Sequence, residues 1–164
     1  MPYSTFLQIK KLLDDNNITY KHITHEPVGK TSQDAAAVRG TSLDNGVKAI
    51  ILKIRDKGYV HKDKFFQVAM PGLQRIDLKK LKILLGVKNI SLASPDEVLS
   101  RTGCTVGSVP PFANLFDMKI YADDSIMQLD EILFSAGTHT DTIMMKSSEY
   151  IRIVNPEIVD LKKE

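Results

Sequence analysis

Residues 47–54 of the chain read VKAIILKI, and this stretch decides the fold class. It is rich in aliphatic residues on both of its alternating faces, which is typical of a central strand covered on both sides. The turn sequence Asp56-Lys57-Gly58 follows, and the run from Tyr59 to Ala69 is again rich in apolar residues. Together these features predict a β-hairpin in which residues 47–54 form the first strand and residues 59–69 the second.

Helical and extended patterns alternate on either side of this hairpin. Expected helices begin at Ser4, at Thr31 or Ser32 (through Val38, with a stop at Gly40), at Asp77 (to Gly86), at Ser94 (to Gly103) and at Ser147 or Ser148. Expected strands cover residues 18–23, 89–92, 119–122, 131–135 and 142–146. Several short strands mixed with helices favour an α+β fold over a doubly wound parallel sheet. Because no repeat or linker interrupts the pattern, we expect a single domain over residues 1–164.

Composition limits the class of protein. The chain has 164 residues, 43% hydrophobic and 26% charged, as in soluble globular proteins. A formal net charge of +2 is too small to indicate a nucleic-acid binder, although a local basic patch remains compatible with it. Cys104 is the single cysteine, so no intramolecular disulfide can form. With no signal-peptide pattern and no apolar run long enough for a bilayer, a cytoplasmic location is the default expectation.

Sequence motifs of common hydrolases and nucleotide-binding proteins are absent. The chain has no G-x-S-x-G elbow, no Walker A loop and no G-x-G-x-x-G turn. His25-Glu26-Pro27 begins like a helical zinc motif, but the proline breaks the helix that this motif needs. His22 and His25 are three residues apart on an expected strand and point to opposite faces, so no metal site is expected. Cys104 has no flanking group that would stabilise a thiolate, and we expect a small buried residue.

Lys48 is the first residue with unusual neighbours. On a strand it shares a face with Ile50, Leu52 and Ile54, and an ammonium there needs an anionic or polar partner or loses its charge. The alternative is a lysine at the solvent end of the strand whose side chain extends outward. Spacing alone favours this alternative, because lysines at strand ends are common.

Two loops are also unusual. Residues 103–112, GCTVGSVPPF, contain two glycines and two prolines, which fix an irregular backbone that can turn its polar groups toward a ligand, with Phe112 as a pocket wall. A plain surface turn is an equal alternative. Residues 136–142, AGTHTDT, place His139 beside Thr and Asp, which suits general-base chemistry, although a polar hairpin loop is the commoner meaning.

Four stretches, in this order, resemble the YbaK/ProX-type aminoacyl-tRNA editing domains, which include the insertion domain of some bacterial prolyl-tRNA synthetases. The first is His25-Glu26-Pro27-Val28 with Thr31 and the alanine-rich run to Gly40. The second is residues 46–53, and the third is residues 103–112 with the family's glycine-x-x-x-proline element at Gly107 to Pro111. The fourth is residues 122–126, ADDSI, leading to residues 135–138, SAGT. Each stretch alone is a weak signal, and the four in order are a strong one.

The resemblance implies an α+β domain with a mixed or antiparallel, barrel-like central sheet flanked by helices. It also implies an ester hydrolase that deacylates mischarged tRNA in trans, without a metal or another cofactor. Lys48 falls on the family's essential lysine and takes the catalytic role. The implied substrate-binding residues are His25, Thr31, Gly107, Ser108, Val109, Pro110, Pro111, Phe112, Gly137, Thr138 and His139.

Substrate and partners follow from the same resemblance. Alanine on prolyl-tRNA is the first expected substrate and cysteine on the same RNA the second, while serine and threonine esters stay open. The expected partners are the acceptor end of the mischarged tRNA and a prolyl-tRNA synthetase, with no membrane. Ala49 and Ala113 stand where other members carry Asn or Thr, and Gly, respectively. The alternative function is a non-catalytic module of the same fold that binds aminoacyl-tRNA or a synthetase.

Overall fold

The computed structural model describes residues 2–27 and 45–164. Its helices are α1 (Pro2–Asp15), α3 (Leu78–Leu85), α4 (Pro95–Thr102) and α5 (Ser147–Val154), with short 3-10 turns η1 (Lys62–Lys64), η2 (Ala113–Phe116) and η3 (Asp124–Gln128). Its strands are β1 (Tyr20–Thr24), β2 (Val47–Ile54), β3 (Phe65–Pro71), β4 (Ile90–Leu92), β5 (Lys119–Asp123), β6 (Glu131–Ser135), β7 (Asp141–Lys146) and β8 (Glu157–Val159). Thr31 and the helix expected from Thr31 or Ser32 to Val38 lie outside the described residues.

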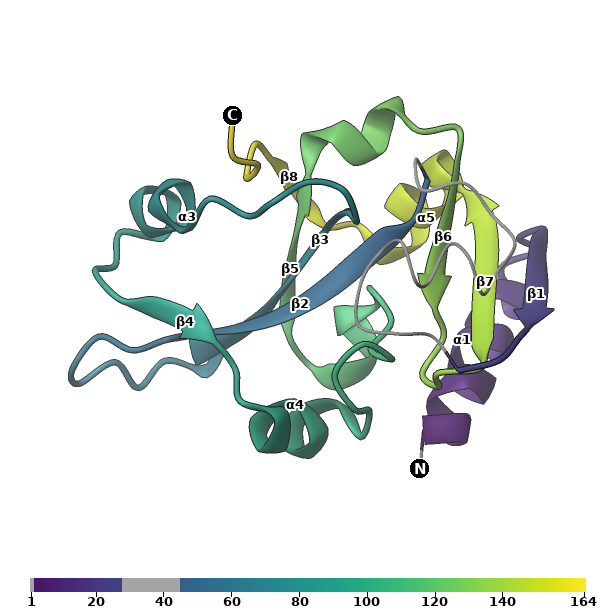
Figure 1. The fold of residues 1–164 in the computed structure, drawn as a ribbon, viewed down its shortest axis with the longest axis horizontal. Coiled ribbons are helices and arrows are strands. Elements are labelled where there is room, and N and C mark those ends of the chain that lie inside the picture. The colour runs from purple at the N-terminus through teal and green to yellow at the C-terminus, as the bar shows by residue number, and fades with distance from the viewer. Residues whose placement is uncertain (1, 28–44) are drawn as a thin grey trace.

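The strands form two sheets that meet at the start of β2 (Figure 1). A mixed sheet has the order β4-β2-β3-β5-β8, and an antiparallel sheet has the order β1-β7-β6. The two meet where Gly46 forms a parallel bridge with Leu133, whose amide donates to the Asn45 carbonyl at 2.9 Å. The predicted α+β class is therefore confirmed, and the single barrel-like sheet is replaced by two sheets joined at one edge.

The central hairpin is confirmed, with one correction. Strand β2 has the predicted bounds and pairs antiparallel with β3, from Val47 opposite Pro71 to Lys53 opposite Phe65. The second strand begins at Phe65 rather than Tyr59, because residues 59–64 form a turn and the η1 helix instead. Two features oppose a strand here. The His61 side chain accepts from the Asp63 amide at 3.2 Å, a local bond that competes with strand pairing. Val60 is 93% exposed, so this segment gains little from burial.

The predicted helix boundaries around α3 and α4 are confirmed by their caps. The Asp77 carboxylate accepts from the Lys79 and Lys80 amides at 2.9 and 3.4 Å, and Gly86 ends α3 in the left-handed conformation. Ser94 and Glu97 form a capping box at the start of α4. Each cap stabilises its helix by about 1 kcal/mol.

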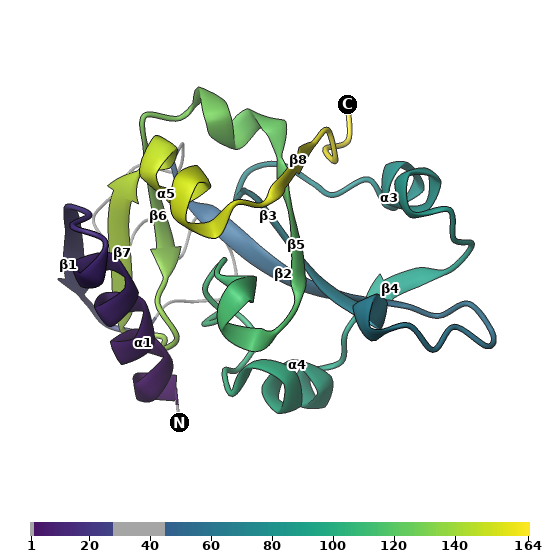
Figure 2. The same cartoon turned by 180° about the vertical axis from the view of Figure 1, so that it is seen from behind.

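Two helices pack on each sheet. Helices α1 and α5 lie on one face of the β1-β7-β6 sheet (Figure 2), where Phe6, Ile9 and Tyr150 join Phe134 and Ile143 in one buried cluster. On the mixed sheet, α3 and α4 pack on opposite faces of β2, because a buried α3 residue and a buried α4 residue cluster with alternating β2 side chains. Leu81 of α3 clusters with Leu52, and Val98 of α4 clusters with Ile51. Among residues 2–27 and 45–164, no helix is long and apolar enough to cross a membrane.

Candidate functional site

Lys48 belongs to a row of residues that crosses four strands on one face of the joined sheets. Gly46 and Leu133 form an isolated parallel bridge, and Lys48 and Ser135, each two residues further along, point to the same side as this pair. Ser135 pairs with Thr142, and Thr142 pairs with Ile23. Residues in register share a face, and this face is opposite the one that α1 and α5 cover. On this face Thr142 is fully buried, whereas Lys48 and Ser135 are partly exposed.

The ammonium of Lys48 is held by main-chain oxygens. Its Nζ donates to the Gln74 carbonyl at 2.6 Å and to the Gly72 carbonyl at 3.3 Å. Partial burial lowers the pKa of Lys48, and the nearby charge of Arg75 lowers it further. The polar partners that the sequence predicted are thus present, and the alternative of a lysine extended into solvent is wrong. An ammonium has three N–H donors, and its two bonds within residues 2–27 and 45–164 leave one for a ligand.

His25 lies at the end of the same face, directly after β1. Its amide donates to the Thr140 carbonyl at 2.9 Å, which continues the pairing of β1 with β7. The ring Nδ1 lies 2.6 Å from the Glu26 carbonyl oxygen, and Nε2 lies 2.7 Å from Thr142 Oγ1. Because a carbonyl can only accept, Nδ1 carries a proton, and a neutral ring then accepts from the Thr142 hydroxyl at Nε2. His25 and Thr142 are in this way linked to the row that contains Lys48.

The two unusual loops contact each other and form a rim at one end of the face. The Gly137 amide donates to the Ser108 carbonyl at 2.9 Å, and His139 Nε2 lies 2.7 Å from Thr105 Oγ1. Gly107 has a φ of +90°, and a Cβ added there would lie 3.4 Å from His139 Cε1. Glycine at this position therefore permits both the left-handed backbone and the close approach of the His139 ring.

Buried side chains hold the loop of residues 103–112, which forms part of the rim, in place. The Gln67 amide donates to the Pro110 carbonyl at 2.9 Å, and the Tyr150 hydroxyl donates to the Pro111 carbonyl at 2.7 Å. Val109, Pro110 and Pro111 are buried, so these residues can act on a ligand only through the backbone that they shape. Polar groups without a partner are costly in a core, and each of these bonds therefore holds the loop in one position.

Phe112 does not wall a pocket, in contrast to the expectation from the sequence. Its ring is fully buried, with centroids 5.2 Å from Phe134 and 5.6 Å from Tyr150. An aromatic ring after two prolines anchors the loop in the core, because burial of its large apolar surface is more favourable than exposure. Ala49 also faces away from Lys48, in the cluster that contains Val109. Ala49 thus contributes to the packing beneath the rim.

A hydrogen-bonded His–Asp pair supports the rim from the side of α1. Asp141 Oδ1 lies 2.6 Å from His22 Nε2, and Asp141 Oδ2 accepts from the Thr138 hydroxyl at 2.6 Å. Partial burial opposes ionisation of Asp141, but the hydrogen bonds from Thr138 and His22 outweigh it and lower the pKa of the carboxyl. His22 and His25 are on opposite faces of β1, as predicted, because only His22 reaches Asp141 beside α1.

Several of these residues were not predicted from the sequence. Ser135 and Thr142 end and begin strands like many other hydroxyl residues, and only the pairing of β6 with β7 brings them together. Gln67 carried a usable signal, since it is the single polar residue in the buried strand Phe65–Pro71. Cys104 is fully buried, which confirms the predicted small buried residue, and burial raises the pKa of its thiol.

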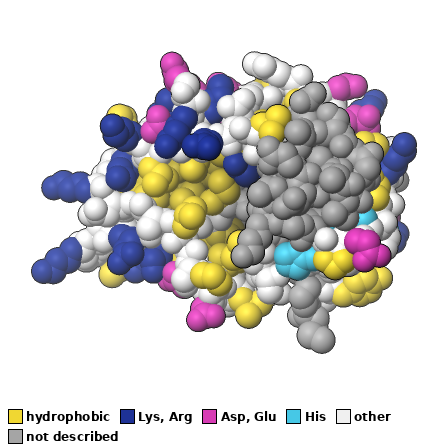
Figure 3. Space-filling view, in the orientation of Figure 1, with side chains coloured by type: hydrophobic (Ala, Val, Ile, Leu, Met, Phe, Trp, Pro, Cys, Tyr) yellow, Lys and Arg dark blue, Asp and Glu magenta, His cyan; other side chains and the backbone are white. Residues whose placement is uncertain are grey.

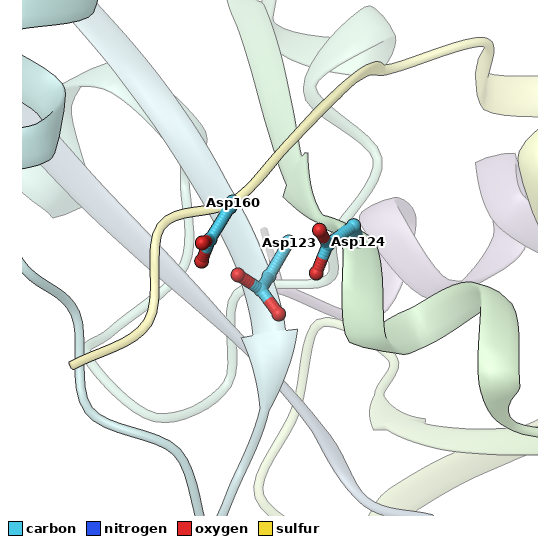
Figure 4. A group of neighbouring side chains, drawn as sticks. All are labelled: Asp123, Asp124 and Asp160. Carbon is cyan, nitrogen blue, oxygen red and sulfur yellow. The ribbon is translucent and has the colours of Figure 1, made fainter. Parts of the chain in front are cut away.

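A group of three carboxylates lies apart from this face, near β5 and the C-terminal segment. Figure 4 shows Asp123, Asp124 and Asp160 side by side, with one oxygen of each within 4.8 Å of the others. The Lys162 ammonium lies 2.7 Å from Asp124, 3.2 Å from Asp160 and 3.7 Å from Asp123. Asp123 also accepts from the Leu161 amide at 2.8 Å. The lysine supplies the positive charge of this group, which fixes the C-terminal segment to β5.

Comparison with known proteins places this geometry in context. The model of the aminoacyl-tRNA editing domain family matches residues 25–153. The multifunctional Ser/Thr-tRNA deacylase ProXp-y of Escherichia coli (strain K12) is 33% identical over 160 residues, which cover 97% of this chain and 93% of that protein. A proline–tRNA ligase of Staphylococcus aureus (strain MRSA252) is 32% identical over 125 residues, 72% of this chain but 21% of the ligase. The solved structure of a candidate trans-editing enzyme for prolyl tRNA synthetase has a TM-score of 0.78 at 20% identity, covers 98% of each chain and shows the shared fold.

Proposed function

Since the chain belongs to the aminoacyl-tRNA editing domain family and is an aminoacyl-tRNA deacylase, we propose that it hydrolyses, in trans, the ester of a tRNA mischarged with serine or threonine. We propose that the ester binds on the face that carries Lys48, Ser135 and Thr142, against the rim of residues 105–108 and 137–139. The chain acts in this proposal as a single domain over residues 1–164.

The observation that carries the proposal is the shared face of Lys48 and Thr142, with His25 bonded to Thr142 at 2.7 Å. A partly buried ammonium with one remaining donor can polarise a carbonyl oxygen or hold a phosphate of the terminal nucleotide. Ser135 and Thr142 pair with each other on the same face of the joined sheets. Such a face combines one cation with neutral hydrogen-bonding groups, as the recognition of an aminoacyl ester requires.

The chemistry needs positioning more than a strong nucleophile. An aminoacyl ester is already activated, so a water oxygen adds to the carbonyl carbon and the C–O bond to the ribose then breaks. The leaving ribose oxygen takes a proton, and the neighbouring ribose hydroxyl can assist this transfer. In this mechanism Lys48 stabilises the developing negative charge on the carbonyl oxygen, and Gly107, Ser108, Gly137, Thr138 and His139 fix the position of the ester.

The choice of serine and threonine rests on two supports. The relative from Escherichia coli that aligns with 97% of this chain is a Ser/Thr-tRNA deacylase. The rim also carries partly exposed polar side chains at Thr138 and His139, and a site that hydrogen-bonds a substrate hydroxyl discriminates strongly against analogues that lack it. Alanine and cysteine on prolyl-tRNA, the first expectations from the sequence, become the competing substrates. Size exclusion alone separates such small side chains by roughly 1–3 kcal/mol per methylene.

The test is a deacylation assay with purified protein and a panel of Ser-, Thr-, Ala- and Cys-charged tRNAs, including Ala- and Cys-tRNA(Pro). We expect hydrolysis of the seryl and threonyl esters and loss of hydrolysis in Lys48→Ala. Lys53→Ala is the matched control, because Lys53 is on the same strand but on the other face, where it pairs with Glu97 at 2.6 Å. Hydrolysis of Ala- or Cys-tRNA(Pro) alone would move the substrate to the first expectation. Binding without hydrolysis of any ester would support the non-catalytic module instead.

Two further parts of the proposal follow from the substrate. The protein acts in the cytoplasm, because aminoacyl-tRNA is made and used there. A prolyl-tRNA synthetase is a proposed partner, since part of the chain aligns with 21% of such a ligase. Co-purification of the two proteins in the presence and absence of tRNA tests this partner.

A further inference from the structure

Positive charge is concentrated in one part of the chain. Residues 53–101 contain eleven Lys and Arg but five Asp and Glu, a formal charge of +6, whereas the remaining residues contain eleven and fifteen, a formal charge of −4. Residues 53–101 include the β2–β3 turn, α3, β4 and α4. Figure 3 shows Lys and Arg side chains gathered over this half of the molecule, around a hydrophobic patch. The net charge of +2 is therefore the sum of a basic part and an acidic remainder. We call the part formed by residues 53–101 the basic half.

Most carboxylates of the basic half are already engaged. Asp56 accepts from the Lys88 and Asn89 amides at 2.6–3.0 Å, Asp77 caps α3, and Glu97 pairs with Lys53. Among the residues that the structure describes, the cations of this half that take part in no ion pair include Arg55, Lys57, Lys62, Lys64, Arg75, Lys79, Lys82 and Lys88. Their charge is thus available for an external polyanion.

Part of this charge forms a path that begins at the candidate site. Helix α3 packs on the face of β2 that carries Lys48, since Leu81 clusters with Leu52 and Met70. The turn that holds the Lys48 ammonium through the Gln74 carbonyl continues directly into Arg75, which is exposed. Lys79 and Lys82 follow on α3, and Lys88 follows α3 in sequence. We define Arg75, Lys79, Lys82 and Lys88 as the basic path.

Lys80 shows that the path occupies one side of α3. Its ammonium pairs with Asp160 at 3.1 Å and donates to the Lys162 carbonyl at 2.7 Å, so it is used within the protein. Residues 79 and 82 are three positions apart on a helix with 3.6 residues per turn, so they share a side, and this side is turned away from the Lys80–Asp160 pair. Within a single turn of α3, Lys80 is thus used inside the protein, and Lys79 and Lys82 can contact an external partner.

We propose that the basic path binds the phosphates of the tRNA acceptor stem and so directs the charged 3′ end to Lys48. The proposal rests on the proposed function, which supplies a substrate with a double-stranded stem next to the ester. Proteins recognise such RNA mainly by its shape and phosphates, and Lys and Arg side chains release counterions as they bind. A path of cations that starts beside Lys48 meets this requirement without reading any base.

The experiment compares wild type with the triple variant Lys79→Ala/Lys82→Ala/Lys88→Ala. Lys80→Ala serves as the control on the same helix, and Lys10→Ala/Lys11→Ala as the control on α1, where both lysines pair with carboxylates. Uncharged tRNA is titrated at several salt concentrations, and the deacylation of charged tRNA gives kcat and KM. The same ester on adenosine alone is the substrate without a stem.

We expect the triple variant to raise the Kd and KM for tRNA on the order of tenfold or more at low salt, and to reduce the salt slope by about one per lysine that contacts a phosphate. The kcat and the rate with the adenosine ester should stay at the wild-type values. An unchanged Kd and salt slope would overturn the proposal, as would absence of tRNA binding by wild type.

The failure of the proposed function gives a different result. A wild-type protein that hydrolyses no ester contradicts the deacylase, whereas the salt titration with uncharged tRNA still decides whether the basic path binds RNA. Vesicles that contain anionic lipid are titrated in parallel. If the triple variant loses vesicle binding and keeps tRNA binding, the path is a membrane surface and the RNA proposal is wrong.

Discussion

The rim of the candidate site and the tip of the β2–β3 turn both contain a glycine in the left-handed region, yet their surroundings differ. Gly107 has a φ of +90° with the His139 ring 3.4 Å from an added Cβ, and Gly58 has a φ of +80° with nothing within 4 Å. The rim is bonded to a second loop and to the core through Gln67. The turn at Gly58 is exposed. The rim is therefore held in a fixed geometry, and the turn at Gly58 is accessible from solvent.

Charge follows the same division. The rim around Gly107 and Gly137 contains His139 and Asp141 as its titratable groups, and Asp141 is engaged by His22 and Thr138. The half of the molecule with the turn at Gly58 has a formal charge of +6 over residues 53–101. Chemistry on an ester depends on atoms held in place, and docking of a polyanion depends on charge and reach. Variants in the site should therefore change kcat, and variants in the basic half should change KM or stability.

The largest effect is expected from Lys48→Ala. Loss of one preorganised donor to a developing oxyanion lowers kcat by roughly 10²–10³-fold, and the fold should persist because Lys48 is at the start of β2. Single-turnover deacylation with circular dichroism as a folding check measures it. Lys48→Arg should restore charge without the geometry and recover little activity. A Lys48→Ala enzyme with wild-type kcat and a raised KM would place Lys48 with the docking surface and break the comparison.

The second effect comes from the matched pair Gly107→Ala and Gly58→Ala. Each places a Cβ on a left-handed backbone and should destabilise the protein by about 1 kcal/mol, measured by urea denaturation. Gly107→Ala should also shift the strained rim backbone beside His139 and lower kcat about tenfold, because small misplacements at a site are costly. Gly58→Ala should leave kcat unchanged. Equal kcat values for the two variants would mean that the rim does not position the substrate.

The two regions also differ in how much of them the sequence predicted. Strand β2, the caps at Asp77 and Ser94 and the stop at Gly86 were correct, because each depends on residues close together in the chain. The parallel pairing of β3 with β5 and the strand β8 were missed. Parallel partners are joined through long connections, and no local pattern encodes which strands meet.

The site shows the same limit. The residues alone singled out Lys48 and both loops, the resemblance gave them their roles, and the contact between Gly137 and Ser108 agrees with loops that face each other. The row through Ser135 and Thr142 depends on the bridge between Gly46 and Leu133, which are 87 positions apart in the chain. Phe112 was assigned to a pocket wall because an aromatic residue in a loop can face a ligand or the core equally well. Only the packing against Phe134 and Tyr150 decides between the two.

The third effect concerns Asp141, which supports the rim. Its pKa is lowered from 3.8, so the stabilisation that it provides is complete above this value and is lost as the pH falls through the lower pKa of the folded state. Asp141→Asn should cost about 1–2 kcal/mol at pH 7 and lower kcat a few-fold, because the Thr138 hydroxyl loses a charged partner. Urea denaturation at pH 7 and pH 3 measures it. The gap between wild type and variant should narrow at the lower pH, and a constant gap would assign the effect to packing.

The smallest effect is expected from Glu97→Gln in the basic half. The hydrogen bond from Lys53 is the main cause that lowers the pKa of Glu97 from 4.5 to about 2, so its stabilisation is present above pH 4.5 and is lost between pH 4.5 and about 2. Glutamine keeps the capping box and removes the partly exposed ion pair, so the cost at pH 7 should be below about 1 kcal/mol. The kcat should equal that of wild type, in contrast to Asp141→Asn. A fall in kcat for Glu97→Gln would show that α4 transmits strain to the loop of residues 103–112, and the two regions would then act as one.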